Sequence, residues 1–129
     1  MKLQISELLE SRVRTLAATP LMDRDFLLHE VARHTRVIEI LAKKRPLPLP
    51  LAKALSHGLC ELLRGQKEDT PEEHRRLIQA AVQYYVENDD DDHDLESPTG
   101  LDDDAEVFVA IAAALDRHDL VDEVAEHLS

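Results

Sequence analysis

A dense acidic run is the part of this sequence where residue types and spacing could do chemistry. Eleven carboxylates fall within the twenty residues from Glu87 to Glu106, and no Lys or Arg occurs from Leu77 to Asp116. Crowded carboxylates repel one another, and hard cations such as Ca²⁺ and Mg²⁺ relieve that repulsion because they prefer oxygen ligands. The run therefore raises two hypotheses of function, a divalent-cation site and an acidic surface for a basic partner.

The spacing of these carboxylates does not match an EF-hand calcium loop. A loop that starts at Asp90 has Leu95 in the glycine position and Leu101 in place of the final glutamate. A start at Asp92 places a serine and Asp103 at those two positions. A looser cation site stays open, with His93 as a further ligand if the ion is a transition metal. Its carboxylate ligands would be Asp90, Asp94, Asp103 and Asp104.

Two other interpretations of the run stay open beside the cation site. It could be a solvated acidic turn followed by a helix-capping cluster, with His93 held as an imidazolium by the surrounding negative charge. It could also contact a basic protein partner through the carboxylates that have no part in the cation spacing or in capping. These partner-binding candidates are Asp89, Asp91, Asp92 and Glu96.

The remaining residues give little support for catalysis. Cys60 lies in the middle of a predicted helix, where a buried and inert thiol is the usual outcome. His34 falls on an apolar helical stripe and is expected to be a hydrogen-bonded core histidine. The sequence has no HExxH helix, no Gly-x-Ser-x-Gly turn and no glycine-rich phosphate loop. The residues favour a non-enzymatic protein; Ca²⁺ or Mg²⁺ is the cofactor that the acidic run could take, and the sequence requires none.

The charge is divided unevenly along the chain. Residues 1–76 hold 14 basic and 11 acidic side chains, whereas residues 77–129 hold 1 and 16, for a total net charge of −12. Such a field disfavours nucleic acid and anionic lipid over the second half and favours cations or a basic partner. The single cysteine cannot form an internal disulfide, and no apolar run approaches the length of a membrane span. We expect a cytoplasmic protein that binds neither nucleic acid nor membranes.

The hydrophobic pattern predicts an all-α fold. Apolar residues make up 43% of the chain, aromatic residues only 3%, and no stretch alternates as a strand would. We expect a single domain over residues 1–129, a compact bundle of five to six helices with the acidic loop before a central apolar helix. The predicted helices cover about 6–18, 23–44, 51–64, 71–86, 102–115 and 119–128, with the acidic loop over Glu87–Leu101.

The expected ends of these helices rest on capping residues. Thr70 with Glu73 three residues later has the spacing of a capping box. An aspartate from Asp102–Asp104 is expected to cap the next helix, and Asp119 the last one. The alternating prolines of Pro46–Pro50 predict a stiff corner within the domain.

Aspartates at fixed spacing also carry a resemblance to a known family. The positions that match are Tyr84, Asp90, Asp94, Gly100 and Asp103-Asp104-Ala105, followed by the apolar stretch Val107–Leu115. In this pattern the chain resembles the YkvA-like family of bacterial domains of unknown function. Between the aspartates it departs from the family, with Asn88, His93 and Ser97 at positions usually held by proline. The resemblance implies a small helical domain whose spaced aspartates shape a tight loop before a core helix, and it implies no activity.

Three hypotheses of function follow from the sequence. The leading one is a non-enzymatic binding or regulatory module that engages a basic protein partner through its acidic loop. The second is a helical protein that binds a divalent cation, for structure or for hydrolysis, through the aspartate cluster. The third is a structural protein that forms homo-oligomers to bury leftover apolar helix faces.

Overall fold

Helices make up the whole of the regular structure in the computed structural model, which describes residues 3, 5–87 and 101–127. Within these ranges there is no strand, which confirms the predicted all-α class. The helices are α1 (Glu7–Ala17), α2 (Arg24–Ala42), α3 (Leu49–Arg64), α4 (Glu72–Glu87), α6 (Asp102–Ala114) and α7 (His118–Ala125).

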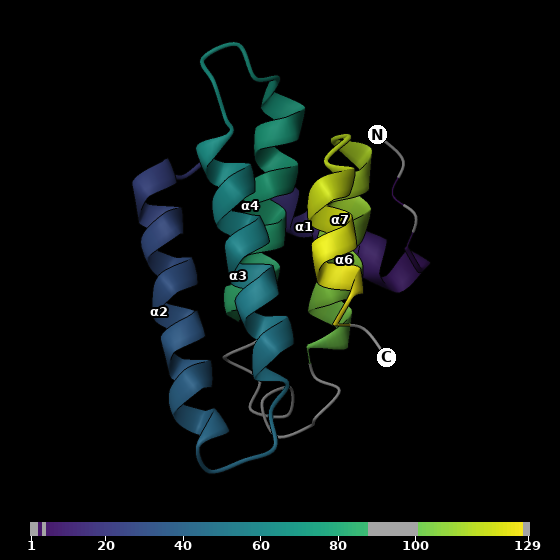
Figure 1. The fold of residues 1–129 in the computed structure, drawn as a ribbon. Coiled ribbons are helices and arrows are strands. Elements are labelled where there is room, and N and C mark those ends of the chain that lie inside the picture. Colours follow the sequence, from purple (N-terminus) through teal and green to yellow (C-terminus); the bar gives the residue numbers. More distant parts are fainter. Residues whose placement is uncertain (1–2, 4, 88–100, 128–129) are drawn as a thin grey trace.

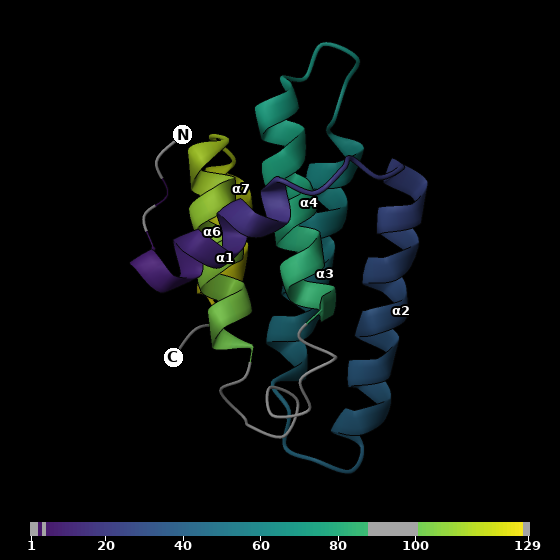
Figure 2. The same cartoon turned by 180° about the vertical axis from the view of Figure 1, so that it is seen from behind.

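The helices run up and down beside one another, except for α1, which lies across α4 and α6 (Figures 1 and 2). α2 lies at one edge, packed on α3 and α4, and α7 lies against α6 and α3. We call the end of the bundle where α4 ends and α6 begins the acidic end. α2 and α7 also end there, and α3 begins there (Figure 1).

The core contains two helices that are buried on more than one face. α6 buries seven of its residues, as its nearly continuous apolar sequence predicts. In α4, every residue from Leu77 to Tyr85 is buried, including Gln79 and Gln83. α6 approaches α3 closely at Gly58, because a Cβ atom there would lie 2.9 Å from Cε1 of Phe108. A small residue at position 58 therefore sets the spacing of these helices.

Three predicted caps differ from the observed ones by one or two residues. Thr70 accepts a hydrogen bond from the Lys67 N–H at 2.7 Å, and the Pro71 carbonyl accepts the first bond of α4. α6 has Leu101 at its N-cap, so Asp102–Asp104 occupy its first turn instead of capping it. Likewise, the N-cap of α7 is Arg117, two residues before the predicted cap Asp119. Propensity indicates the turn where a helix begins, whereas tertiary packing selects the residue.

The link from α6 to α7 is a tight turn at Asp116, which adopts a left-handed conformation with φ 62°. Its N–H donates to the Ala113 carbonyl, and the Arg117 N–H donates to the Ala112 carbonyl. This pair of bonds is a Schellman motif, which satisfies carbonyls at the end of α6. The turn reverses the chain so that α7 packs back along α6. None of the helices in the described ranges has the length and apolar character needed to cross a membrane.

Candidate functional site

Most of the acidic residues singled out from the sequence lie outside the described residues. Among the candidate cation ligands, only Asp103 and Asp104 are described. Those that fall outside are Asp89, Asp90, Asp91, Asp92, His93, Asp94 and Glu96. The structure therefore describes the residues on either side of the run, at the C-terminal end of α4 and the N-terminal end of α6, and those of α7.

Adjacent aspartates in the first turn of α6 have opposite environments. Asp103 is exposed to solvent, whereas Asp104 is only 4% exposed. Consecutive residues on a helix do not face each other, so these two carboxylates cannot converge on one ion without distorting the turn. Among the described residues no group of three His, Cys, Asp or Glu side chains could hold a metal ion. The predicted cation site thus has only divergent ligands within the described part of the chain.

Five carboxylates of α6 and α7 are accessible to solvent and have no cation beside them. Within the described ranges none of these side chains forms an ion pair with a basic residue. Three lie in the first two turns of α6, one on α7 and one at the C-cap of α7; all are exposed except the first, which is half-buried. They are Asp102, Asp103, Glu106, Asp122 and Glu126.

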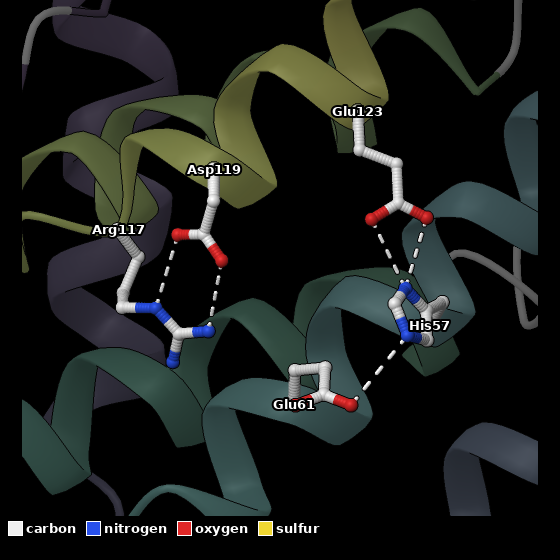
Figure 3. Close-up of polar contacts among 5 residues, drawn as sticks. All are labelled: His57, Glu61, Arg117, Asp119 and Glu123. Atoms are coloured by element: carbon white, nitrogen blue, oxygen red, sulfur yellow. Dashed lines mark hydrogen bonds and ion pairs between the residues drawn. The ribbon is translucent and has the colours of Figure 1, made fainter.

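The one arginine in this half of the chain is already engaged. Arg117 binds Asp119 through Nε and Nη2, each 3.2 Å from a carboxylate oxygen (Figure 3). The hydrogen bond from Arg117 lowers the pKa of Asp119, and the same bond raises the pKa of Arg117. This pair holds the start of α7 and leaves the charge of the other carboxylates uncompensated.

The acidic end also has a basic corner. Lys43, Lys44 and Arg45 lie between α2 and α3, at the end of the bundle where α6 begins (Figure 1). In the sequence this corner has three positive charges, whereas the run from Glu87 to Glu106 has eleven carboxylates.

A histidine bridges α3 and α7 at the surface. His57 has Nδ1 2.9 Å from Oε1 of Glu123 and Nε2 3.5 Å from Oε1 of Glu61 (Figure 3). The two carboxylates bind opposite nitrogens of the ring, so the three side chains do not enclose a metal position. Sequence reasoning missed this bridge because Glu123 lies 66 residues from His57. The contact fastens α7 to the bundle.

The interior holds a polar cluster where α2 meets α4. The Thr35 hydroxyl donates to the Val31 carbonyl at 2.8 Å, so the Tyr85 hydroxyl must donate to Thr35, also at 2.8 Å. His34 is buried as predicted and meets the Tyr85 ring edge-on, with centroids 4.6 Å apart. Burial raises the pKa of Tyr85, and the negative charge of Asp104 raises it further, against the hydrogen bond to Thr35. A phenol held in this state is no acid or base near neutral pH.

Two further residues from the sequence interpretation have structural surroundings. Burial raises the pKa of the Cys60 thiol more than the nearby Arg64 lowers it, so the thiol stays protonated and weakly nucleophilic. Tyr84, the first position of the family resemblance, is buried under the Arg12 guanidinium, which lies 5.0 Å from the ring centroid. The thiol of Cys60 and the ring of Tyr84 are thus both placed by packing against neighbouring helices.

The amide side chains of α4 fasten the connector between α1 and α2. Gln79, only 1% exposed, donates to the Pro20 carbonyl at 2.8 Å and accepts from the Met22 N–H at 2.7 Å. The hydroxyl of Thr19 donates to Gln83 at 3.2 Å. Arg76 donates to the Thr19 carbonyl at 2.8 Å. The glutamines therefore satisfy polar groups of the connector, which explains why they are buried in the core.

A cleft of about 470 Å³ opens at the other end of the bundle, between the start of α2 and the link from α3 to α4. Its charged lining is balanced, with three basic and three acidic side chains. Gln79 also lines it, but both ends of that amide are engaged by the connector. Arg75 likewise donates to backbone carbonyls of Thr70 and Lys67. The cleft thus lacks a set of polar groups that converge on a ligand.

Comparisons with known proteins supply no relative. Neither the models of known protein families, nor curated proteins, nor solved structures give a match to this chain. The family resemblance of the acidic run stays a prediction, and function has to be argued from the chain itself.

Proposed function

We propose that this protein is a non-enzymatic binding module whose acidic end engages a basic segment of a protein partner. The observation that carries this proposal is the set of solvent-accessible carboxylates of α6, α7 and the α7 C-cap that have no cation within the described part of the chain. They flank the acidic run at its α6 side, where residues 77–129 hold 16 acidic side chains and 1 basic one. Like charges held together on a folded surface destabilise it, and a basic ligand removes that cost.

The interior supports a binding role in preference to catalysis. Tyr85 and Cys60 are held in their neutral forms, and His34 lies inside the core against an aromatic ring. The carboxylates at the surface, by contrast, are ionised acceptors that can pair with Lys and Arg. Recognition by charge is therefore the chemistry that the accessible groups can perform.

The strength of this recognition should depend on salt. Interactions between exposed charges are screened over a Debye length of about 8 Å at physiological ionic strength. Complementary charge acts mainly on the rate of association, which falls as the salt concentration rises. We expect a lysine-rich peptide, used as the probe, to bind at low salt and to dissociate as NaCl is added.

The matched test compares two sets of four neutralised carboxylates. The first set, at the acidic run, is Asp89→Asn, Asp91→Asn, Asp92→Asn and Glu96→Gln. The second, elsewhere on the surface, is Glu7→Gln, Asp25→Asn, Glu68→Gln and Asp69→Asn. Both change the net charge equally. Binding of the fluorescent lysine-rich peptide, measured by anisotropy, should weaken about tenfold or more, roughly 1.4 kcal/mol or above, with the first set and little with the second. Equal losses would mean that only net charge matters and would refute a localised site.

The cation hypothesis is a separate prediction with its own measurement. A cation that binds the native state raises the melting temperature in line with ln(1 + [L]/Kd). Melting with EDTA and then with Ca²⁺, Mg²⁺, Mn²⁺ or Zn²⁺ distinguishes a specific site from general screening. A shift that Asp90→Asn and Asp94→Asn abolish would favour the cation site. Shifts that follow ionic strength alone would favour the binding module.

A further inference from the structure

The outer face of α2 exposes large apolar side chains. Phe26 is 49% exposed and Ile40 is 52% exposed, and Met22, just before the helix, is 40% exposed. The sequence has only four aromatic residues, and the other three are buried in the core. Each of these apolar side chains would need no explanation alone. Their interest lies in the charged residues between them on the same side of the helix, Glu30, Arg33 and Arg36.

Phe26 and Ile40 lie on the side of α2 that faces away from the bundle, and with Arg33 between them they make a stripe along the helix. At about 100° per residue, Phe26, Arg33 and Ile40 fall within roughly 40° of one another around the helix. Leu27, Val31 and Ile38 occupy the opposite side and are buried. α2 lies at the edge of the bundle, with α3 and α4 behind it (Figures 1 and 2). The stripe is therefore open to a partner along its whole length.

The stripe has the same pattern of complementary residues in both directions from its middle. Glu30 and Arg36 lie three residues on either side of Arg33, and Phe26 and Ile40 lie seven residues on either side. If two copies of α2 pair antiparallel about Arg33, a residue that precedes Arg33 in one copy lies level with the residue that follows Arg33 by the same number of positions in the other copy. Glu30 would then face Arg36 of the second copy, and Phe26 would face Ile40, each contact occurring twice. Self-complementary surfaces of this kind form two-fold dimers.

We propose that the exposed stripe of α2 is a homodimer interface, in which two copies pair antiparallel about a two-fold axis at Arg33. A hollow of about 160 Å³ between α2 and α4 adjoins Phe26 and is lined by Met22, Val82 and Val86. Ile40 of the second copy packs on Phe26 at the rim of this hollow. Near the axis, each Arg33 is neutralised by Glu30 of its own helix, whose Oε2 lies 2.9 Å from Nε.

The contact involves one helix from each copy, which limits its strength. A helix of 19 residues is about 28 Å long, and an interface of that length lies at the small end of the range for specific complexes. The dimer should therefore form and dissociate with protein concentration. It uses none of the carboxylates of α6 and α7, so it is independent of the binding function proposed above.

The test is the mass of the protein in solution, by light scattering and sedimentation over a concentration series. The wild-type mass should rise from the 14.6 kDa of one chain toward twice that value. Arg36→Glu places like charges at both contacts and should give a monomer, as should Glu30→Arg. Lys53→Glu, which makes the same charge change on the exposed surface of α3, should behave as wild type.

Mixing the two monomeric variants tests the antiparallel register. In a mixed pair, the two substituted positions face each other with opposite charges, and the native Arg36 of one chain faces the native Glu30 of the other. The mixture should therefore regain the mass of a dimer, which misfolded variants would not do. A wild-type protein that stays monomeric throughout the series would overturn the proposal. So would a dimer that Arg36→Glu leaves unchanged, or a mixture that stays monomeric.

Discussion

Asp103 and Asp104 are neighbours in the sequence and belong to two different regions of the molecule. Asp103 is exposed at the acidic end, whereas Asp104 is buried and contributes negative charge near the Tyr85 hydroxyl. The difference comes from the helix, since a rotation of about 100° per residue turns one side chain to solvent and the next to the core. An acidic run is therefore not one functional unit. The interior residues stabilise the fold, and the surface residues are free to bind.

The largest effect in this comparison is expected where polar side chains are buried. Gln79→Ala should destabilise the protein by about 3 kcal/mol, because the Met22 N–H and the Pro20 carbonyl lose their partners and a gap remains in the core. Urea unfolding gives the free energy directly. Gln66→Ala is the matched control, at a partly buried glutamine outside the core, and should change it by less than about 0.5 kcal/mol. Equal effects would show that the buried amide is no more important than a surface one.

The contact of α6 with α3 should produce the next largest effect. Gly58→Ala would force a methyl group against the Phe108 ring, and the overpacking should exceed the gain in helix propensity by about 1–2 kcal/mol. Combining it with Phe108→Leu should cost less than the sum of the two single changes, because the smaller side chain makes room. A stabilising Gly58→Ala would mean that α6 does not approach α3 as described.

The buried Tyr85 hydroxyl in the polar cluster should make the stability of the protein depend on pH at high pH. Burial raises the pKa of Tyr85 in the native protein, and an unfolded tyrosine ionises near pH 10. Its stabilising contribution is therefore complete below about pH 10 and is lost as the pH rises above that value. Tyr85→Phe should cost about 1 kcal/mol at neutral pH, for the lost hydrogen bond, and make the alkaline loss of stability less steep.

A tyrosinate absorption titration separates the two aspartates within this prediction. Asp104→Asn should lower the pKa of Tyr85, because a negative charge near the phenol is removed. Asp103→Asn, on the exposed side of α6, should leave the titration unchanged. Identical curves for the two variants would contradict the division between interior and surface.

The smallest effect on stability is expected for the two accessible aspartates in the first turn of α6. Asp102→Asn and Asp103→Asn remove negative charge from the N-terminal turn, where the helix dipole favours it, and relieve repulsion between neighbours. These contributions oppose each other, so each change should alter the unfolding free energy by about 0.5 kcal/mol or less. A thermal melt of each variant checks this, and a much larger loss would place these side chains in the folding core.

The helices and their order could be predicted from the sequence because apolar residues repeat every three or four positions. The buried stripe of α2, with Leu27, Val31, His34 and Ile38, lies where that spacing predicts. The extensive burial of α4 could not be predicted, since Gln79 and Gln83 are polar and their partners lie about 60 residues away in the chain. The same separation hides the bridge from His57 to Glu123. Contacts of this kind depend on how helices pack, which local spacing does not specify.

For the candidate site, only the amino-acid composition could be predicted from the sequence. The sequence indicates that carboxylates dominate residues 87–106, and it does not indicate that Asp104 turns inward while Asp103 turns outward. That choice depends on which face of α6 packs on the core, and the nearly continuous apolar sequence of the helix does not distinguish one face from another. The predicted cap was also wrong, because Leu101 occupies it. Similarly, the exposed stripe of α2 was not distinguished from core positions, because Phe26 and Ile40 are as apolar as buried residues.

The central claim is that the described carboxylates at the acidic end bind a basic partner while the interior holds the fold. The most direct measurement is anisotropy of a lysine-rich peptide with Asp102→Asn, Asp103→Asn and Glu106→Gln combined, alongside Glu7→Gln, Asp25→Asn and Glu68→Gln combined. We expect the first triple variant to bind about tenfold more weakly than the second, roughly 1.4 kcal/mol, with the same melting temperature. Equal affinities for the two triple variants would contradict the account.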